Sequence, residues 1–315
     1  MQIPALYQYY LQHPTICIDT RKITAGCLFF ALKGPNFNGN AFAKEALEKG
    51  AQWIIIDEAQ FKISEQCILV EDVLTCLQQL ATYHRKQFTI PFIAITGSNG
   101  KTTTKELVST VLASHYKTYT TKGNLNNHIG VPLTILSVGK DAEMAVIEMG
   151  ANHQLEIASY CAYTLPTHGM ITNCGKAHLE GFGGEAGVRK GKGELFDSLR
   201  DHQGTAFVMS DYDYLNDMSK GIKEIITYGA HSGDIQANAI DHHGMISLEG
   251  TKGFNERIDT QLVGTYNLPN VLAAVTIGLH FKVPMEKIKS AIEHYTPTNS
   301  RSQLMNWHNN QLILD

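Results

Sequence analysis

A phosphate-binding loop at residues 97–102 constrains the fold of this chain more than any other stretch. The apolar run Phe92–Ile95 predicts a buried strand, and Lys105–Leu112 predicts an amphipathic helix. Between them stands Thr-Gly-Ser-Asn-Gly-Lys-Thr-Thr (96–103), a glycine-rich turn that enters a helix through Lys-Thr. A strand, a turn and a helix in this order are typical of a loop that binds nucleotide phosphates.

The residue types in this loop indicate separate chemical roles. Glycines let backbone N–H groups converge on a phosphate, and the helix N-terminus adds partial positive charge. Lys101 is expected to reach the outer phosphates, and Thr102 to offer its hydroxyl to Mg²⁺. Ile95 replaces the first glycine of the common pattern, so this is the shorter G-x-x-G-K-T form; the alternative is an ordinary Gly-Asn turn, which Lys-Thr disfavours. The residues expected to contact the nucleotide here are Gly97, Ser98, Asn99, Gly100, Lys101, Thr102 and Thr103.

Length and composition limit the classes of protein to consider. The chain has 315 residues, 43% of them hydrophobic and 18% charged, as in globular proteins of two or more domains. A net charge of −4 predicts no general attraction to nucleic acid or anionic membranes. No apolar run approaches the roughly 20 residues of a membrane span. The six cysteines form no C-x-x-C pair, and no signal peptide is evident, so we expect a cytoplasmic protein.

Alternation of strands and helices predicts an α/β fold. After residues 1–88, a small α/β unit, strands are expected at 92–96, 145–149, 169–173, 205–209 and 224–228, with helices between them. This order favours a mostly parallel, doubly wound sheet with the phosphate loop at the carboxyl end of its strand. Three further strands at 235–239, 245–248 and 258–262 predict a smaller antiparallel sheet, and helices are expected at 268–281 and 284–294.

Several polar residues after these strands could carry chemistry. Glu148 ends a strand, which suits a Mg²⁺ ligand better than a solvated loop glutamate. His178 follows another strand, and a ligand and a surface histidine are about equally compatible with its position. Lys190 and Lys192 lie at a basic helix start, for which plain solvation is the alternative.

Asparagines are concentrated at two further places. Asn267 and Asn270 begin a helix, where they either cap it or read the edge of an adenine. A second loop has more amides than a turn needs and could line a sugar or peptide substrate. That loop contains Asn124, Asn126, Asn127 and His128.

Four motifs together resemble the Mur ligase family. They are Thr-Gly-Ser-Asn-Gly-Lys-Thr-Thr-Thr-Lys-Glu (96–106), Gly-Asn-Leu-Asn-Asn-His-Ile-Gly-Val-Pro-Leu-Thr (123–134), Glu-Met-Gly-Ala-Asn-His (148–153) and Ala-His-Leu-Glu-Gly-Phe-Gly (177–183). Tyr-Asn-Leu-Pro-Asn-Val-Leu-Ala-Ala (266–274) adds to them. The second and third motifs resemble the branch that joins D-alanyl-D-alanine to UDP-N-acetylmuramoyl-tripeptide.

The resemblance implies a reaction and roles for the residues. ATP phosphorylates the peptide carboxylate, and the amine of D-alanyl-D-alanine displaces the phosphate to give an amide. Thr102 and Glu148 are then expected to hold one Mg²⁺ and His178 a second. The family also has a carbamylated lysine four residues before an aromatic, a spacing that Lys192 shares with Phe196. The residues that the resemblance places on ATP are Asn267, Asn270, Arg301 and Asp315.

The first unit resembles the uridine-binding domain of the family, with Thr20 in place of a common serine. The residues implied to contact the UDP-sugar are Thr20, Arg21, Lys33, Gly34, Asn38 and Gly39. His128 stands where relatives often have an acidic residue.

The resemblance also divides the chain into three parts. We expect a UDP-sugar-binding domain over 1–88, an ATP-binding domain over 89–300, and the start of a truncated third domain over 301–315. Without a complete third domain, this chain is expected to bind ligands as a monomer without ligating at a useful rate. Another Mur branch, a folyl-polyglutamate ligase, or a UDP-sugar- or nucleotide-binding fragment without catalysis are the alternative functions.

Overall fold

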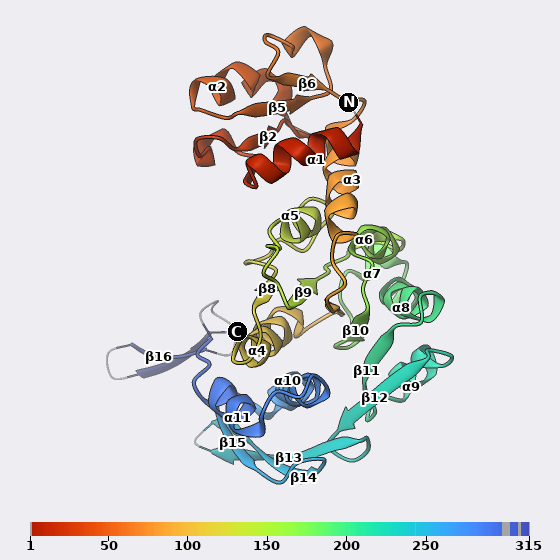
Figure 1. Cartoon of the computed structure of the whole chain (residues 1–315). Coiled ribbons are helices and arrows are strands. Elements are labelled where there is room, and N and C mark those ends of the chain that lie inside the picture. The colour runs from red at the N-terminus through yellow and green to blue at the C-terminus, as the bar shows by residue number, and fades with distance from the viewer. Residues whose placement is uncertain (1, 243, 298–302, 308–309, 315) are drawn as a thin grey trace. The chain divides into compact units, whose positions relative to one another are not determined.

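The structure is a computed structural model that describes residues 2–242, 244–297, 303–307 and 310–314 (Figure 1). Its packing divides the chain into two units. The first unit comprises Met1–Thr89, Asn127–Gly139 and Ala162–Leu165. The second comprises Ile90–Asn126, Lys140–Cys161 and Pro166–Asp315. The predicted division at residues 88 and 300 stays a prediction, and the sequence did not anticipate the two inserted segments of the first unit.

A parallel sheet forms the centre of the first unit. Its strands in spatial order are β1 (Ile16–Cys17), β2 (Leu28–Phe30), β5 (Trp53–Ile56) and β6 (Cys67–Leu69). The helices are α1 (Ile3–Gln12), α2 (Ala43–Glu48), α3 (Val73–Arg85) and the inserted α5 (Gly130–Leu136). The short elements are β3 (Lys33–Gly34), β4 (Phe37–Asn38) and the 3-10 turns Thr20–Lys22, Gly39–Phe42 and Ala59–Phe61. The predicted α/β character of this unit is confirmed, and Asp72 caps α3 by accepting the N–H of Thr75.

Buried polar side chains of α3 hold the inserted segments within the first unit. His84 donates from Nε2 to the carbonyl of Val138 (2.8 Å) and accepts from the hydroxyl of Tyr7 (3.0 Å). Arg85 donates to the carbonyls of Thr164 and Leu165 at 2.8 and 2.9 Å. Burial lowers the pKa of His84, in agreement with a neutral ring that both donates and accepts.

The second unit is built on one long sheet with the predicted parallel core. In the described residues the order is β15-β14-β13-β12-β11-β10-β7-β9-β8. Its parallel strands are β7 (Phe92–Thr96), β8 (Thr118–Thr120), β9 (Met144–Glu148), β10 (His168–Ile171), β11 (Thr205–Met209) and β12 (Glu224–Gly229). The antiparallel end consists of β13 (Ile235–His242), β14 (Met245–Lys252) and β15 (Arg257–Val263). A short parallel pairing of β12 with β13 joins the antiparallel end to the core.

Helices cover this sheet, and the phosphate-loop helix lies among them. They are α4 (Lys101–Ala113), α6 (Glu156–Thr164), α7 (Leu179–Phe182), α8 (Glu185–Asp201), α9 (Asp213–Ser219), α10 (Leu268–His280) and α11 (Met285–Glu293), with a 3-10 turn at Thr265–Asn267. In Figure 1, α10 lies beside α4, and α11 lies over β15. No helix in the described ranges has both the length and the hydropathy to cross a membrane.

Near the end of the chain, β17 (Asn310–Leu314) pairs antiparallel with β16 (Gln303–Trp307). Arg301 and Asp315, predicted to contact ATP, lie outside the described residues.

Leu155 adopts a left-handed backbone conformation (φ 70°) with its side chain 72% exposed. This conformation costs a non-glycine residue about 1–2 kcal/mol, whereas glycine loses about 0.5–1 kcal/mol through its flexible unfolded chain. Leu155→Gly should therefore raise the free energy of unfolding by about 0.5–1 kcal/mol in urea titrations. Leu179→Gly, a matched change of an exposed leucine in α7, should lower it. If Leu155→Gly instead lowered the free energy of unfolding, the backbone at Leu155 would not be strained.

Two histidines pack together at the amino-terminal edge of the sheet, and from their burial we expect the free energy of unfolding to fall in acid. His168 in β10 and His280 in α10 pack edge to face with ring centroids 5.4 Å apart, against Phe207 and Phe281. Burial, and then the charge of His280, lower the pKa of His168 to about 4. The unfolded chain, with an ordinary pKa near 6.5, binds the proton first, so stability present above that value is lost as the pH falls towards 4.

We expect His168 to contribute about 2–3 kcal/mol to this loss between pH 7 and pH 4.5, which urea titrations at both values would measure. His168→Phe, which fills the same aromatic site without titrating, should show that much less pH dependence. Equal pH dependence of the two chains would exclude His168 as the source.

Candidate functional site

The strand, turn and helix of the phosphate loop lie where the sequence predicts them. β7 ends at Thr96, and α4 begins at Lys101. Gly97 and Gly100 have φ values of 143° and 80°, which glycine adopts at little cost. A side chain at Gly97 would collide with Thr172, and one at Gly100 would come within 2.6 Å of Oδ1 of Asn270. Both glycines are therefore required by conformation and by close approach.

The start of α4 offers an anion site. The first-turn N–H groups of a helix have no partner within the helix, and they concentrate positive potential there. Lys101 adds a cation, whose Nζ donates to the carbonyl of Ser98 at 2.9 Å. The ammonium group is therefore folded back over the loop.

The sheet places this loop at its switch point, where chain connections diverge to opposite sides. β7 lies between β9 and β10, and all three run parallel. Ile95 pairs with Glu148, and Thr96 pairs with Ile171. The carboxyl ends of the three strands therefore meet at one edge, which is where sheets of this kind bind ligands.

Glu148 is the buried acid of the site. It is 1% exposed, and its Oε1 accepts from the hydroxyl of Thr102 (3.2 Å) and from Nδ2 of Asn126 (2.8 Å). Its other oxygen, Oε2, is buried without a hydrogen-bond partner among the described residues. A buried carboxylate oxygen with no partner is costly, and a hard cation would satisfy it. The donor set thus fits Mg²⁺, and the predicted substrate residue Asn126 orients the acid.

The two candidate lysines of α8 differ in environment. Lys192 is 2% exposed, whereas Lys190 is exposed to solvent. Nζ of Lys192 donates to the carbonyl of Ala151 at 3.0 Å and lies 4.9 Å from the centroid of the Phe182 ring. Burial, and then the charge of Lys101, lower the pKa of Lys192 to about 8. This environment raises the neutral fraction of the Lys192 amine above that of an ordinary lysine.

His178 is exposed and has a left-handed backbone (φ 52°) just before α7. No three His, Cys, Asp or Glu side chains form a metal-binding group within the described part of the chain. The second Mg²⁺ position thus stays a prediction from the resemblance.

The two asparagines predicted to contact adenine lie beside α4. Asn270 accepts from the hydroxyl of Thr104 (3.0 Å) and donates to Oδ1 of Asn267 (2.9 Å). Asn267 is 1% exposed and also donates to the carbonyl of Val263. In this arrangement both side chains are engaged in protein contacts, with Asn270 the nearer to the phosphate loop.

The remaining residues of the asparagine-rich loop are exposed. Asn127 accepts the N–H groups of Ile129 and Gly130, which gives it a role at the start of α5. Asn124 and His128 expose their side chains, as a substrate-contacting loop would.

In the first unit, β3 and β4 form a small hairpin beside two acids. Lys33 pairs with Asp57 (3.1 Å) and Glu58 (3.7 Å), and Asn38 donates to Glu58 at 2.9 Å. A side chain at Gly34 would collide with the ring of Phe37. The structure therefore brings Lys33, Gly34 and Asn38 together.

Asp57 was missed by the sequence analysis. It accepts from Asn40 (2.8 Å) and from the N–H of Val73 (3.2 Å) as well as pairing with Lys33. Burial raises the pKa of Asp57, but these donors outweigh it and leave a net lowering. An acid directly after the apolar run Trp53–Ile56 was the available signal.

The other predicted uridine contacts lie in neighbouring turns. Arg21 forms a two-pronged ion pair with Asp19 and is exposed, and Thr20 precedes it in the same 3-10 turn. Gly39 donates its N–H to the carbonyl of Leu32, and a side chain there would collide with the backbone.

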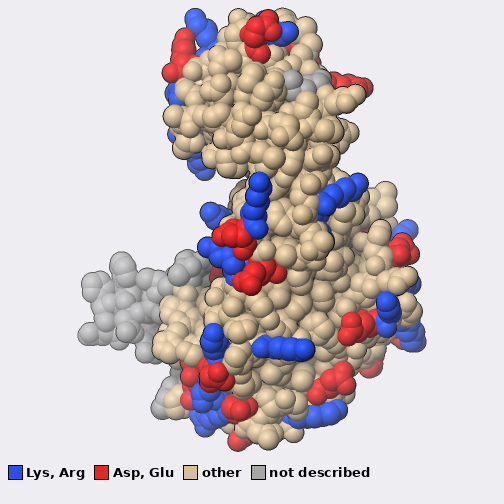
Figure 2. Space-filling model, viewed as in Figure 1, with Lys and Arg blue, Asp and Glu red and all other residues tan. Residues whose placement is uncertain are grey.

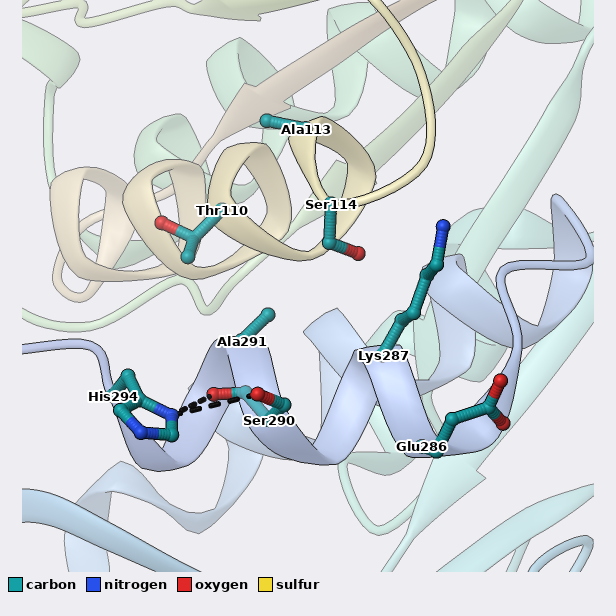
Figure 3. A pocket seen from close by; sticks show the side chains of 8 residues that line it. All are labelled: Thr110, Ala113, Ser114, Glu286, Lys287, Ser290, Ala291 and His294. Atoms are coloured by element: carbon teal, nitrogen blue, oxygen red, sulfur yellow. Dashed lines mark hydrogen bonds between the residues drawn. The ribbon is translucent and has the colours of Figure 1, made fainter.

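An open cavity of about 720 Å³ lies between the last turn of α4 and α11 (Figure 3). Thr110 and Ser114 line it from α4 and its end, and Lys287 and His294 line it from the opposite side. None of the predicted site residues lines this cavity, because it lies at the end of α4 remote from the phosphate loop. On the face drawn in Figure 2, acidic and basic side chains are intermixed.

A phosphate loop at the switch point of a doubly wound sheet, beside a buried acid, defines an α/β nucleotide-binding protein of the P-loop class. Within that class, residues 95–278 match the Mur ligase middle domain, and residues 14–85 match the Mur ligase family catalytic domain. The chain belongs to the Mur ligase family.

Curated relatives carry one shared name, UDP-N-acetylmuramoyl-tripeptide–D-alanyl-D-alanine ligase. That of Escherichia coli K12 is 35% identical over 95% of this chain and 67% of its own length. That of Bacillus subtilis 168 is 33% identical over 92% of this chain and 64% of its own length. The chain thus spans about two thirds of the length of these relatives.

Solved structures of similar proteins share the fold. A crystal structure of MurF from Acinetobacter baumannii superposes with a TM-score of 0.87 at 31% identity, covering 96% of this chain and 67% of the other. MurF ligase from Thermotoga maritima in complex with ADP gives a TM-score of 0.85 at 25% identity, covering 96% and 71%. The predicted fold class is confirmed.

Proposed function

We propose that this chain provides the UDP-sugar and ATP sites of an ATP-dependent ligase that joins D-alanyl-D-alanine to UDP-N-acetylmuramoyl-tripeptide. The observation that carries the proposal is one sheet edge that gathers the phosphate loop and Glu148, whose Oε2 has no hydrogen-bond partner in the described ranges. The names of the curated relatives and the ADP complex of the Thermotoga maritima protein support the substrates. A cytoplasmic location agrees with ATP and a UDP-sugar as substrates, and a monomer stays a prediction.

The proposed reaction has two steps. An oxygen of the tripeptide carboxylate bonds to the γ-phosphorus of ATP as the bond from that phosphorus to the bridging oxygen breaks, which releases ADP. The amine of D-alanyl-D-alanine then bonds to the activated carbonyl carbon, phosphate leaves, and the amine loses a proton. The chain must hold the phosphates and neutralise the negative charge that develops during phosphoryl transfer. The N–H groups at the start of α4 and the ammonium group of Lys101 are suited to both tasks.

Glu148 and Thr102 would hold Mg²⁺, through the buried Oε2 and the hydroxyl. When bound, the ion neutralises phosphate charge and polarises the transferring phosphoryl group. Asn126 orients the carboxylate by its hydrogen bond to Oε1. His178 is proposed for a second ion from the family resemblance alone.

Lys192 is proposed to be carbamylated. Only a neutral amine can form a bond to the carbon of CO₂ and then release a proton, and burial at Lys192 increases the fraction in that form. The product is an anion with two oxygens, which replaces a buried cation near Lys101 by an attractive partner. Lys190, being exposed, lacks this driving force.

The adenine and ribose contacts are proposed by resemblance. Asn270 and Asn267 would contact the base, since Asn270 lies against Gly100 at the phosphate loop. Arg301 and Asp315 would contact the phosphates and ribose.

The hairpin containing Lys33 is proposed to bind uridine diphosphate. Lys33→Ala should weaken UDP binding by the full chain about tenfold, because a hydrogen bond to a charged group is lost. Titration calorimetry would measure the affinity, and amide shifts near Thr20, Arg21, Lys33 and Asn38 would locate it. Lys44→Ala, an exposed lysine of α2, is the matched control and should bind UDP normally. UDP binding without shifts at these residues would remove the assignment.

Calorimetry with two UDP-sugars tests the function as a whole. UDP-N-acetylmuramoyl-tripeptide should bind more tightly than the corresponding dipeptide, and ADP release should depend on D-alanyl-D-alanine where turnover occurs. Preference for the dipeptide would favour the branch that adds a single diamino acid. Binding of folates in place of UDP-sugars would favour a folyl-polyglutamate ligase.

A further inference from the structure

The segment that follows β10 forms hydrogen bonds to the backbone of the phosphate loop. Asn173 accepts the N–H of Asn99 with Oδ1 and donates from Nδ2 to the carbonyl of Asn99, both at 3.1 Å. Thr172 donates its hydroxyl to the same carbonyl at 2.6 Å. One side chain therefore binds both backbone groups of a single loop residue.

Ser98 is held by the same segment. Its N–H donates to the carbonyl of Asn173 (2.9 Å), and its hydroxyl donates to the carbonyl of Gly175 (3.0 Å). The backbone amides of Ser98 and Asn99, expected from sequence to face phosphate, are thus engaged by Asn173. The N–H groups at the start of α4 have no acceptor within the helix, and they are the ones that we expect to meet a phosphate.

Fixing the loop matters for affinity. A glycine-rich loop has many conformations, and ordering it when a ligand binds costs free energy. Thr172 is 4% exposed and packs against Gly97, so the end of β10 is a rigid support. Bonds from this support hold the loop in one conformation before nucleotide arrives.

We propose that Asn173, with Thr172, is a positioning residue for nucleotide binding: it pre-organises the phosphate loop so that the amides from Gly100 onward point at the β-phosphate. The identity of the ligand rests on the proposed function, whereas the hydrogen bonds to the loop do not depend on it.

The test compares three variants in the full chain. Asn173→Ala should weaken Mg·ADP binding about tenfold, because two hydrogen bonds that order the loop are lost. Thr172→Val, which keeps the shape and removes the hydroxyl, should weaken it less, about threefold. Asn216→Ala is the control, since Asn216 is a half-buried asparagine that also bonds a backbone carbonyl (2.8 Å, to Ser210) away from the loop.

Two readouts separate positioning from general structure. Hydrogen exchange at the Asn99 amide should accelerate in Asn173→Ala without nucleotide, whereas the thermal midpoint and the UDP affinity should not change. The phosphorus-31 shift of the β-phosphate of bound ADP should also move.

Unchanged Asn99 exchange and unchanged ADP affinity in Asn173→Ala would overturn the proposal. An equal loss in Asn216→Ala would overturn it too, because the effect would then be general. Failure of the unmodified chain to bind ADP would count against the proposed function, and exchange at Asn99 would still decide whether Asn173 holds the loop.

Discussion

Lys192→Ala is expected to remove carbamate formation and to reduce any D-alanyl-D-alanine-dependent ADP release at least about 100-fold. The buried amine has a pKa near 8, and its carbamate would supply two anionic oxygens beside the nucleotide site. Carbon-13 bicarbonate would label the carbamate for detection by NMR. Added bicarbonate should not restore the variant, whereas small carboxylic acids should restore part of the activity by replacing the lost oxygens.

Lys190→Ala is the matched control, because Lys190 lies two residues away on the same helix and is exposed. It should keep both the carbamate signal and the activity. If Lys190→Ala lost them and Lys192→Ala kept them, the assignment of Lys192 would be wrong.

Lys101→Ala is expected to weaken binding of a non-hydrolysable ATP analogue by about 100-fold, with a much smaller effect on AMP. The reason is that Lys101 is proposed to contact the outer phosphates, which AMP lacks, and its ammonium group already lies over the loop at Ser98. Calorimetry with both nucleotides would measure the ratio, and circular dichroism would show that the fold is intact. Phosphoryl transfer should be abolished.

Lys176→Ala controls for the loss of a nearby cation, since Lys176 is exposed and pairs with Glu185. It should bind the ATP analogue almost normally. Equal weakening of ATP-analogue and AMP binding in Lys101→Ala would contradict a role at the outer phosphates.

Local pattern was sufficient to predict the strands of the long sheet of the second unit other than β8, and the edge of the sheet where the phosphate loop lies. Buried strands such as Phe92–Thr96 and Met144–Glu148 appear as apolar runs, and the polar residue at the end of each run marks the edge. Glu148 and the phosphate loop were identified in this way, because parallel strands bring their carboxyl ends together.

What the sequence could not predict depends on contacts between distant segments. The burial that distinguishes Lys192 from Lys190 comes from Phe182 and Ala151, which precede both lysines on separate segments. The hydrogen bond from Asn126 to Glu148 joins residues 22 positions apart in the sequence, and that from Asn173 to Asn99 joins residues 74 positions apart. The spacing of apolar residues along the sequence carries no information about such pairs.

The inserted segments of the first unit have a consequence for how the chain can be divided. The chain passes between the units at 89/90, 126/127, 139/140, 161/162 and 165/166, so several covalent connections join them. A single proteolytic cut after Thr89 would not release the first unit. A fragment of residues 1–88 would lack Val138 and Leu165, leaving His84 and Arg85 without the carbonyls that they bind. The first unit is therefore completed only after the chain has been synthesised to Leu165, by which point β7, β8 and β9 of the second unit have been synthesised as well.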